Sequence, residues 1–280
     1  MNFLPVQHDP ATLARYGELF AACFPGVHKF TPAYLDWLYL ANPDGKAVGY
    51  DAWDGERLAA HYVCVPARVW VEGRESLVLL SLNTATHPDY QGKGLFTKLA
   101  AMTYEAGAAA GFAGVYGVAN ANSTPGFIRK LGFQLVRPLE ARVGLGGLRH
   151  RAPPAPHTLS FGRSWNAEAL AWRCANPHNP VWRRPGGRFY AAAAGLRLPA
   201  YAELPDDPAP AGVEAGPGLS PLRLFIGLAP DAASRYWNYA SIPMSLRPSP
   251  LNLIWRAFGE GPSRLDAARI QFSFLDFDAY

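Results

Sequence analysis

One segment, residues 82–99, joins an apolar strand pattern to a glycine loop, Gly92-Lys93-Gly94, and then to the start of an amphipathic helix. Free N–H groups at a helix start point outward with the positive end of the helix dipole, and glycines let an anion approach the main chain. The segment therefore predicts a phosphate-binding turn that needs no metal. The Walker spacing is absent, and Thr97 stands where the third glycine of a dinucleotide-binding loop would be.

The residues around this turn predict an α/β domain in which a mixed, mostly antiparallel sheet is flanked by helices. Asp9 and Thr31 each precede a proline, which is typical of a helix start. Apolar residues at helical spacing indicate helices, and alternating runs bounded by turn residues indicate strands. We expect helices that begin at 10, 32 and 95 and a helix at 124–131, with strands at 48–53, 58–65, 68–71, 76–86, 114–118 and 133–143.

Composition excludes several classes of protein. Hydrophobic residues make up 49% and charged residues 17% of the 280 positions, which excludes intrinsic disorder. The 26 Lys and Arg residues are scattered, so no nucleic-acid partner is expected, and a net charge of +4 suits an anionic small molecule. With no secretory pattern at the N-terminus and no apolar run long enough to span a bilayer, a cytoplasmic protein without membrane contact is expected. Cys23, Cys64 and Cys174 are far apart, so we expect neither disulfides nor a metal site.

A proline-rich linker at 149–160 divides the chain into residues 1–148 and 161–280. Strand patterns at 198–204, 222–228, 251–255 and 272–277 predict that the second half forms its own sheet. A single amphipathic helix pattern is weak evidence for a duplication, but here the spacing is closely kept. The first half has Phe30, Leu35 and Trp37 with Ala41-Asn42-Pro43, and the second half has Trp165, Leu170 and Trp172 with Ala175-Asn176-Pro177.

The run from Gln91 to Phe96 resembles the Q/R-x-x-G-x-G/A acyl-CoA loop of the GNAT acyltransferase superfamily. Residues 120–133, which end in Lys130-Leu-Gly-Phe133, resemble a second motif of that family. The likeness covers residues 1 to about 145. It implies a GNAT fold followed by a degenerate GNAT-like half, because no CoA loop stands between Leu204 and Pro221, and this second half would bind the acceptor.

What the resemblance implies is an acyl-CoA-dependent N-acyltransferase of the tandem GNAT type. Acetyl-CoA or a short acyl-CoA is the expected co-substrate, and a nucleotide-linked (dTDP- or UDP-) amino sugar for surface polysaccharide synthesis is the expected acceptor. An aminoglycoside or protein-lysine acetyltransferase and a non-catalytic CoA-binding module are the alternatives. A homodimer is possible, because an exposed edge strand could pair two copies.

Two positions depart from the family pattern. Phe96 stands where the loop usually has a second Gly or Ala, and Ile128 stands where many members have the Tyr that protonates the departing thiolate. Water, Tyr116 or Tyr90 could replace that Tyr, and the sequence does not choose among them.

The implied mechanism is direct attack of an amine on the thioester, with a backbone N–H from residues 83–87 stabilising the oxyanion. Asn83 is thus one of three catalytic candidates. Asn120, Asn122 and Ser123 would bind the cofactor, although such residues before a helix are as often simple caps. The other expected cofactor-binding residues are Thr84, Ala85, Thr86, Gln91, Gly92, Lys93, Gly94, Leu95 and Phe96.

Two histidines are the remaining catalytic candidates. His87 is the first candidate for removing the amine proton, because a histidine titrates near neutral pH and this one borders the loop. His61, on the adjacent strand, is the second. A structural histidine is the commoner case, and bulk water could take the proton from a weakly basic sugar amine.

For the acceptor, Trp182, Arg183 and Arg184 offer a stacking face and guanidinium groups that could hold a base and a diphosphate. A solvated surface turn is the alternative. Tyr201 and the C-terminal residues 276–280 are expected to line a cleft between the halves, although the alternation at 272–277 equally indicates an edge strand.

Overall fold

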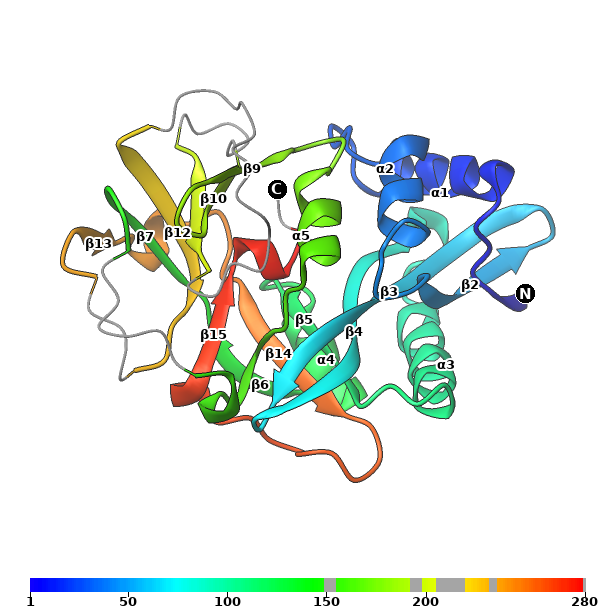
Figure 1. The fold of residues 1–280 in the computed structure, drawn as a ribbon. Helices are drawn as coiled ribbons and strands as arrows, with labels where there is room; N and C mark the ends of the chain where they lie inside the picture. The colour runs from blue at the N-terminus through cyan, green and yellow to red at the C-terminus, as the bar shows by residue number, and fades with distance from the viewer. Residues whose placement is uncertain (149–154, 192–197, 205–219, 232–235, 279–280) are drawn as a thin grey trace.

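The computed structural model describes residues 1–148, 155–191, 198–204, 220–231 and 236–278 (Figure 1). The helices are α1 (Pro10–Cys23), α2 (Pro32–Tyr39), α3 (Leu95–Ala109), α4 (Thr124–Leu131) and α5 (Ala167–Cys174). The strands are β1 (Asn2–Pro5), β2 (Val48–Asp54), β3 (Arg57–Val71), β4 (Arg74–Thr86), β5 (Gly114–Ala119), β6 (Gln134–Pro138), β7 (Glu140–Leu145), β8 (Phe161–Arg163), β9 (Val181–Arg184), β10 (Arg188–Ala191), β11 (Ala200–Glu203), β12 (Leu222–Leu228), β13 (Tyr239–Ser241), β14 (Asn252–Ala257) and β15 (Ile270–Ser273). Of the short 3₁₀ turns, η1 (Pro88–Tyr90) and η5 (Phe274–Asp276) matter below.

The first half is a mixed sheet with helices on both faces, as the sequence predicts. Asp9 and Thr31 cap α1 and α2 by accepting bonds from backbone N–H groups of the first turn. Along β3, Val63 and Val65 pack with α1 and α2, whereas Tyr62 and Cys64 pack with α3 and α4. This alternation places α1 and α2 on one face of the sheet and α3 and α4 on the other.

The two strands expected at 58–65 and 68–71 are one strand, β3, in spite of Pro66. Pro66 pairs with Leu79 of β4, while the pairing of β2 with β3 stops at Cys64. On that free edge the missing N–H of Pro66 loses no ladder bond, and its carbonyl accepts a bond from Asn42 Nδ2 (2.8 Å).

The expectation that the second half forms its own sheet is wrong, because the two halves exchange strands. β14, from the second half, lies between β5 and β6 of the first, antiparallel to both. β7, from the first half, lies between β12 and β13 of the second, again antiparallel to both. The single strand expected at 133–143 is accordingly divided after Pro138, where the chain leaves one half for the other. The result is a continuous sheet through the molecule (Figure 1).

The internal echo seen in the sequence corresponds to a symmetric contact between α2 and α5. Trp37 and Trp172 stack with ring centroids 4.8 Å apart. Each indole N–H donates to the backbone carbonyl of the other tryptophan, at 2.8 and 2.9 Å. The side chains of Asn42 and Asn176 both accept backbone N–H bonds from the turn that follows their helix. The matching residues therefore occupy matching positions.

Each half also has a pair of parallel strands that diverge. β4 pairs with β5 only over Leu79–Ser81 and Val115–Gly117. β11 pairs with β12 only at Ala200 and Leu224, and β15 then takes the edge of β12 that β11 leaves. The segment expected as a strand at 272–277 is thus β15 followed by η5, and it fills the opening of the second half. The opening of the first half has no such strand within the described residues.

Among the helices that the structure describes, none is both long and apolar enough to cross a membrane. Of the linker expected at 149–160, residues 149–154 lie outside the described part of the chain, as do residues 205–219, where the sequence shows no CoA loop.

Candidate functional site

The glycine loop has the geometry of an anion site. Gly92 and Gly94 have φ angles of +76° and +75°, and Gly94 is the N-cap of α3. A Cβ atom at either glycine would meet no other heavy atom within 4 Å, so the loop faces open space. Within the described residues, the first helical N–H with an acceptor is that of Lys98, and those of residues 92–97 have none. These six N–H groups are therefore available to a ligand.

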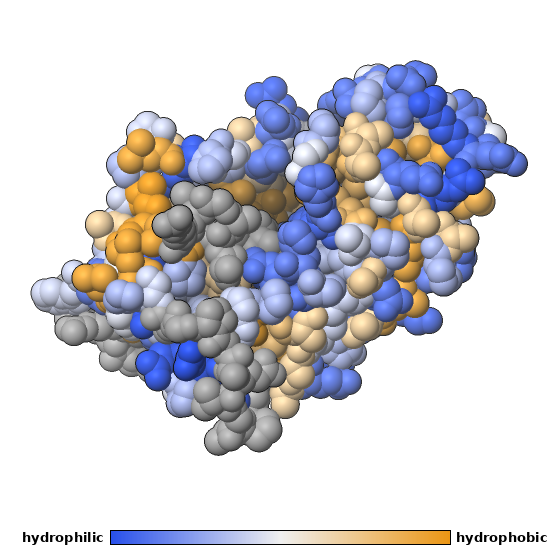
Figure 2. All heavy atoms as spheres, turned by 90° about the horizontal axis from the view of Figure 1, so that it is seen from above, coloured by the Kyte–Doolittle hydropathy of each residue, from blue (hydrophilic) through white to orange (hydrophobic). Residues whose placement is uncertain are grey.

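A cavity of about 680 Å³ begins where β4 and β5 separate. It is lined by the α1–α2 loop (residues 24–30), by β4 from Leu80 to Thr84 and by Val118 of β5. The second half contributes His178, Phe277 and Asp278. Viewed from the side on which α1 and α2 lie, Figure 2 shows apolar surface in a hollow between the two halves.

β4 carries a bulge at the edge of this cavity. Its pairing with β3 shifts register between Val63 and His61, and Asn83 in the bulge has a φ of +46°. Asn83 and Thr84 line the cavity, while Ala85 is buried and Thr86 pairs with Ala60. A bulge leaves one residue out of the ladder, so a backbone N–H at this point is free for other partners.

A buried chain of hydrogen bonds runs from Asn83 into the core. Asn83 Nδ2 lies 3.3 Å from Tyr39 Oη, which lies 3.1 Å from His61 Nε2. His61 Nδ1 lies 2.6 Å from Asp51 Oδ1, and the Tyr16 hydroxyl donates to Asp51 Oδ2 at 2.7 Å. Tyr39 and His61 are fully buried, and burial raises the pKa of Tyr39 and of Tyr16. His61, the second catalytic candidate, is thus linked to the cavity through Tyr39 rather than exposed to it.

His87, the first candidate, is not brought to the cavity. It precedes η1, and its Nδ1 accepts a bond from the backbone N–H of Asp89 (3.2 Å). Its Nε2 lies 3.0 Å from Arg57 Nη2. Both ring nitrogens therefore face donors of neighbouring residues. This geometry favours the structural role for His87, which the sequence allowed as the alternative to a catalytic one.

The residues after β5 form a hydrogen-bonded turn before α4, and the Ser123 side chain does not cap the helix. Asn120 Oδ1 accepts bonds from the N–H groups of Asn122 and Ser123, and Ser123 Oγ accepts one from the N–H of Asn120. Asn120 and Ser123 thus bond to each other before α4, and within the described residues the Asn122 side chain makes no hydrogen bond.

The hydroxyl groups of the two tyrosine candidates for the missing acid, Tyr116 and Tyr90, both donate to other groups of the protein. Ile128 packs in the α3–α4 core. The Tyr116 hydroxyl is buried and donates to the carbonyl of Asp276 (2.9 Å), and burial raises its pKa. Tyr90 Oη donates to Asp54 Oδ2 (2.8 Å), and this bond raises the pKa of Tyr90. Tyr62, which the sequence did not single out, packs on the α3 face of the sheet and bonds to the Tyr104 hydroxyl and to Ser81 Oγ (2.7 Å), and Ser81 lines the cavity.

The expectation that C-terminal residues line a cleft between the halves agrees with the position of Asp278. Its Oδ2 accepts a bond from Lys29 Nζ (3.0 Å) and one from the Tyr34 hydroxyl, and its Oδ1 accepts one from Asn176 (3.3 Å). One carboxylate from the second half is therefore held in the wall of the cavity at the first half's opening. Tyr280 lies outside the described residues.

The four residues expected to bind the acceptor lie elsewhere. Trp182, Arg183 and Arg184 belong to β9, at the far edge of the sheet from β4. Tyr201 is buried on β11, and its hydroxyl donates to Glu203. None of the four lines the cavity between β4 and β5.

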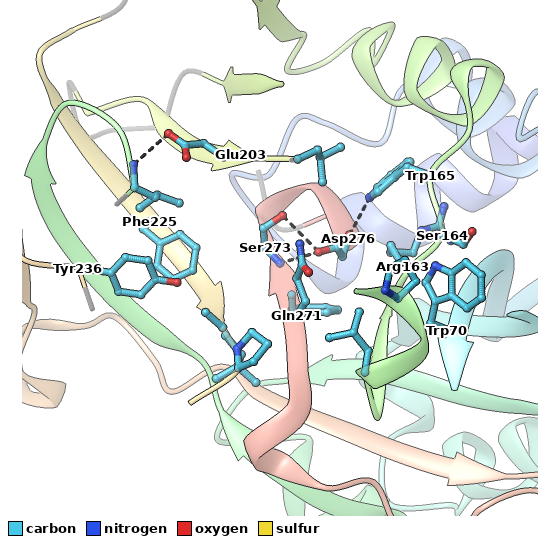
Figure 3. Close-up of a pocket in the computed structure, with 18 residues that line it drawn as sticks. Trp70, Arg163, Ser164, Trp165, Glu203, Phe225, Tyr236, Gln271, Ser273 and Asp276 are labelled. Atoms are coloured by element: carbon cyan, nitrogen blue, oxygen red, sulfur yellow. Dashed lines mark hydrogen bonds between the residues drawn. The ribbon is translucent and has the colours of Figure 1, made fainter. Parts of the chain in front are cut away.

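A second cavity, of about 260 Å³, lies beside the filled opening of the second half. Figure 3 shows Trp70 and Trp165 on one side and Phe225 and Tyr236 on the other, with Ser273 between them. Trp165 lines this cavity and Phe30 lines the first one. Residues 271–273 and Asp276 line the second cavity, and Phe277 and Asp278 line the first.

Residues 10–136 match the family model of the GNAT acetyltransferase domain. A probable N-acyltransferase from Enterococcus faecalis, of unknown function, is 11% identical with a TM-score of 0.56, covering 92% of this chain and 73% of that one. A GCN5-related N-acetyltransferase from Kribbella flavida is 13% identical with a TM-score of 0.58, covering 91% and 71%. One from Anabaena variabilis is 11% identical with a TM-score of 0.55, covering 92% and 73%. No curated protein matches the chain.

At these identities the solved structures show a shared fold, and the family match concerns the first half. The first half therefore has a GNAT acetyltransferase domain, and the chain as a whole shares the mixed α/β fold of these solved structures. The protein is an enzyme, a transferase with a GNAT acetyltransferase domain.

Proposed function

We propose that the protein transfers an acyl group from acyl-CoA to the amine of a small acceptor. The observation that carries this proposal is the opening between β4 and β5, which has a cavity at its mouth and leads along β4 to the free N–H groups of α3. The pyrophosphate of CoA binds at residues 91–96, and the thioester lies at the bulge of β4. GNAT structures from Escherichia coli and Brucella melitensis contain CoA and acetyl-CoA.

The reaction needs few groups from the protein. The amine nitrogen attacks the thioester carbon, a backbone N–H at the Asn83–Thr84 bulge stabilises the oxyanion, and the carbon–sulfur bond then breaks. The amine loses one proton, and the departing thiolate takes up one proton, so the charges balance. Because the Tyr116 and Tyr90 hydroxyls donate to other groups, we propose that water accepts the first proton and donates the second.

The acceptor is proposed to enter the cavity of about 680 Å³ from the side of residues 24–30. His28, Lys29 and His178 could meet the diphosphate of a nucleotide-linked amino sugar, the acceptor expected from the sequence. The cavity is neither strongly acidic, as a polycationic aminoglycoside or a lysine-rich protein would favour, nor lined by the arginines of β9. A role in surface polysaccharide synthesis, a cytoplasmic location and a homodimer stay predictions.

We also propose that the two halves, 1–148 and 161–280, are copies of one fold. The symmetric Trp37–Trp172 contact and the reciprocal exchange of β7 and β14 support this. The second copy does not bind CoA in this proposal, because β15 fills the opening between β11 and β12.

Thermal-shift measurements with CoA, acetyl-CoA, dTDP and UDP test these assignments. A ligand at 100 times its Kd adds about 2.7 kcal/mol to the free energy of unfolding. CoA alone should raise the Tm, and CoA with one nucleotide should raise it further. A rise with CoA alone removes the nucleotide-linked acceptor, and no rise with CoA contradicts the proposed function. Binding of CoA without single-turnover acyl transfer would indicate a CoA-binding module.

A further inference from the structure

In the buried chain of hydrogen bonds from Tyr16 to Asn83, the donor and the acceptor of each bond can be assigned from the groups involved. Tyr16 Oη accepts a bond from the backbone N–H of Gln7 (3.0 Å), and its proton points to Asp51 Oδ2. The other oxygen of Asp51 lies 2.6 Å from His61 Nδ1, and because a carboxylate oxygen accepts, a neutral imidazole here carries its proton on Nδ1. His61 Nε2 is then a bare acceptor, and it can only accept the hydroxyl proton of Tyr39.

This direction determines the orientation of Asn83. Once Tyr39 donates to His61, its oxygen has only lone pairs left, and it must face the Nδ2 group of the Asn83 carboxamide. The carbonyl oxygen, Oδ1, is the opposite end of the same amide. It accepts no bond within the described residues and is not a buried atom, and Asn83 lines the cavity.

We propose that Asp51, His61 and Tyr39 are positioning residues that present the Oδ1 of Asn83 to the acceptor amine. An amine that donates one N–H to this oxygen is held with its lone pair free for the thioester carbon. The inference rests on the proposed function for the identity of the ligand, whereas the direction of the chain follows from the contacts alone.

Reversing the chain should turn the amide round without removing a bond. In Asp51→Asn, the Oδ1 of the new side chain takes the Tyr16 hydroxyl, and its Nδ2 donates to His61 Nδ1. The imidazole proton moves to Nε2, Tyr39 accepts it, and the Tyr39 hydroxyl donates to Asn83 Oδ1. The Nδ2 group of Asn83 then faces the cavity, where it repels an amine N–H.

A second substitution, Asn83→Asp, should restore activity to Asp51→Asn, and only the proposed orientation of the Asn83 side chain predicts this rescue. In Asp51→Asn with Asn83→Asp, one carboxylate oxygen accepts the reversed Tyr39 hydroxyl and the other faces the cavity as an acceptor. In Asn83→Asp alone, a carboxylate oxygen faces the lone pairs of the Tyr39 oxygen, so the two repel each other and no hydrogen bond forms. We expect each single variant to lose about tenfold or more in kcat/KM for the acceptor, and the double variant to recover most of it.

The kinetics need two controls. The Kd for ADP, the part of CoA proposed to bind at the glycine loop, should change less than about twofold in all three variants, because the chain does not contact that loop. Tyr239→Phe removes a buried tyrosine hydroxyl of the second half, which donates to the Gly146 carbonyl (2.8 Å) and lines neither cavity, and should leave kcat/KM for the acceptor near the wild-type value. A double variant no more active than the single variants overturns the proposal.

A spectroscopic readout separates this inference from the proposed function. The ¹⁵N chemical shifts of the His61 ring report which nitrogen carries the proton, in the wild-type protein without any ligand. We expect the proton on Nδ1 in the wild-type protein and on Nε2 in Asp51→Asn. A wild-type proton on Nε2 overturns the inference even if acyl transfer is found, and the expected tautomers with no CoA binding would remove only the proposed function.

Discussion

At the scale of single residues, Gly94 and Asn83 do what neighbouring side chains could not. Gly94 adopts a φ of +75° at the start of α3, where a side chain would be strained and would stand among the free N–H groups. Asn83 also has a positive φ, which asparagine tolerates better than most residues. The two positions mark the proposed anion site and the proposed reaction site.

The anion site can be tested with two glycines of the same conformation. Gly94→Val should reduce CoA affinity by at least tenfold, because the side chain blocks the N–H groups of the loop. Gly111 ends the same helix region with a φ of +86° and open space around it, so Gly111→Val carries a similar strain of about 1 kcal/mol or more. Calorimetric titration with CoA should show a loss only for Gly94→Val, and equal losses would place the site elsewhere.

Asp276 should make stability depend on pH. Burial raises the pKa of its carboxyl to about 6 from 3.8. The folded state therefore holds a proton that the unfolded chain has lost, and the free energy of unfolding falls as pH rises from about 4 to about 6, by up to about 3 kcal/mol. Asp276→Asn, which stays neutral, should lack this loss. Urea unfolding at pH 4.5 and 7 measures this change in the free energy of unfolding for both proteins. An equal change in the wild-type protein and in Asp276→Asn would contradict the assignment.

At the scale of elements, the sequence predicted the helices well, because their caps and prolines are local signals. It did not reveal the partner of His61, since a bulge between Ala52 and Trp53 shifts the β2–β3 register so that Asp51, not Tyr50, lies opposite His61. Nor did it reveal the exchange of β7 and β14. An alternating strand pattern states which face is buried, but not which strand lies beside it.

The exchanged strands make each half dependent on the other. β14 places Leu253, Ile254 and Trp255, all fully buried, between β5 and β6. A fragment of residues 1–148 should therefore show no cooperative unfolding transition, and residues 155–280 added in trans should restore one. A fragment 1–148 that unfolds cooperatively at the Tm of the full chain would contradict this reading of the sheet.

At the scale of the whole molecule, the opening between β4 and β5 is free within the described residues, whereas the opening between β11 and β12 is filled by β15. The continuous sheet and the stacked Trp37–Trp172 pair join the halves, so calorimetry should give a single transition with equal calorimetric and van't Hoff enthalpies. Two separated transitions would show that the halves fold independently. The segment from β15 to Asp278 passes from the filled opening to the wall of the open cavity, so the second half contributes part of that wall.

The central claim is acyl transfer from CoA to an amine at the β4–β5 opening. The most direct measurement is a single-turnover reaction with acetyl-CoA and a set of amines that includes dTDP- and UDP-linked amino sugars, followed by mass spectrometry. The account predicts one acylated amine for each free thiol released, and loss of both products in Gly94→Val. Tight binding of CoA with no acylated amine from any acceptor, or thiol release that persists unchanged in Gly94→Val, would contradict it.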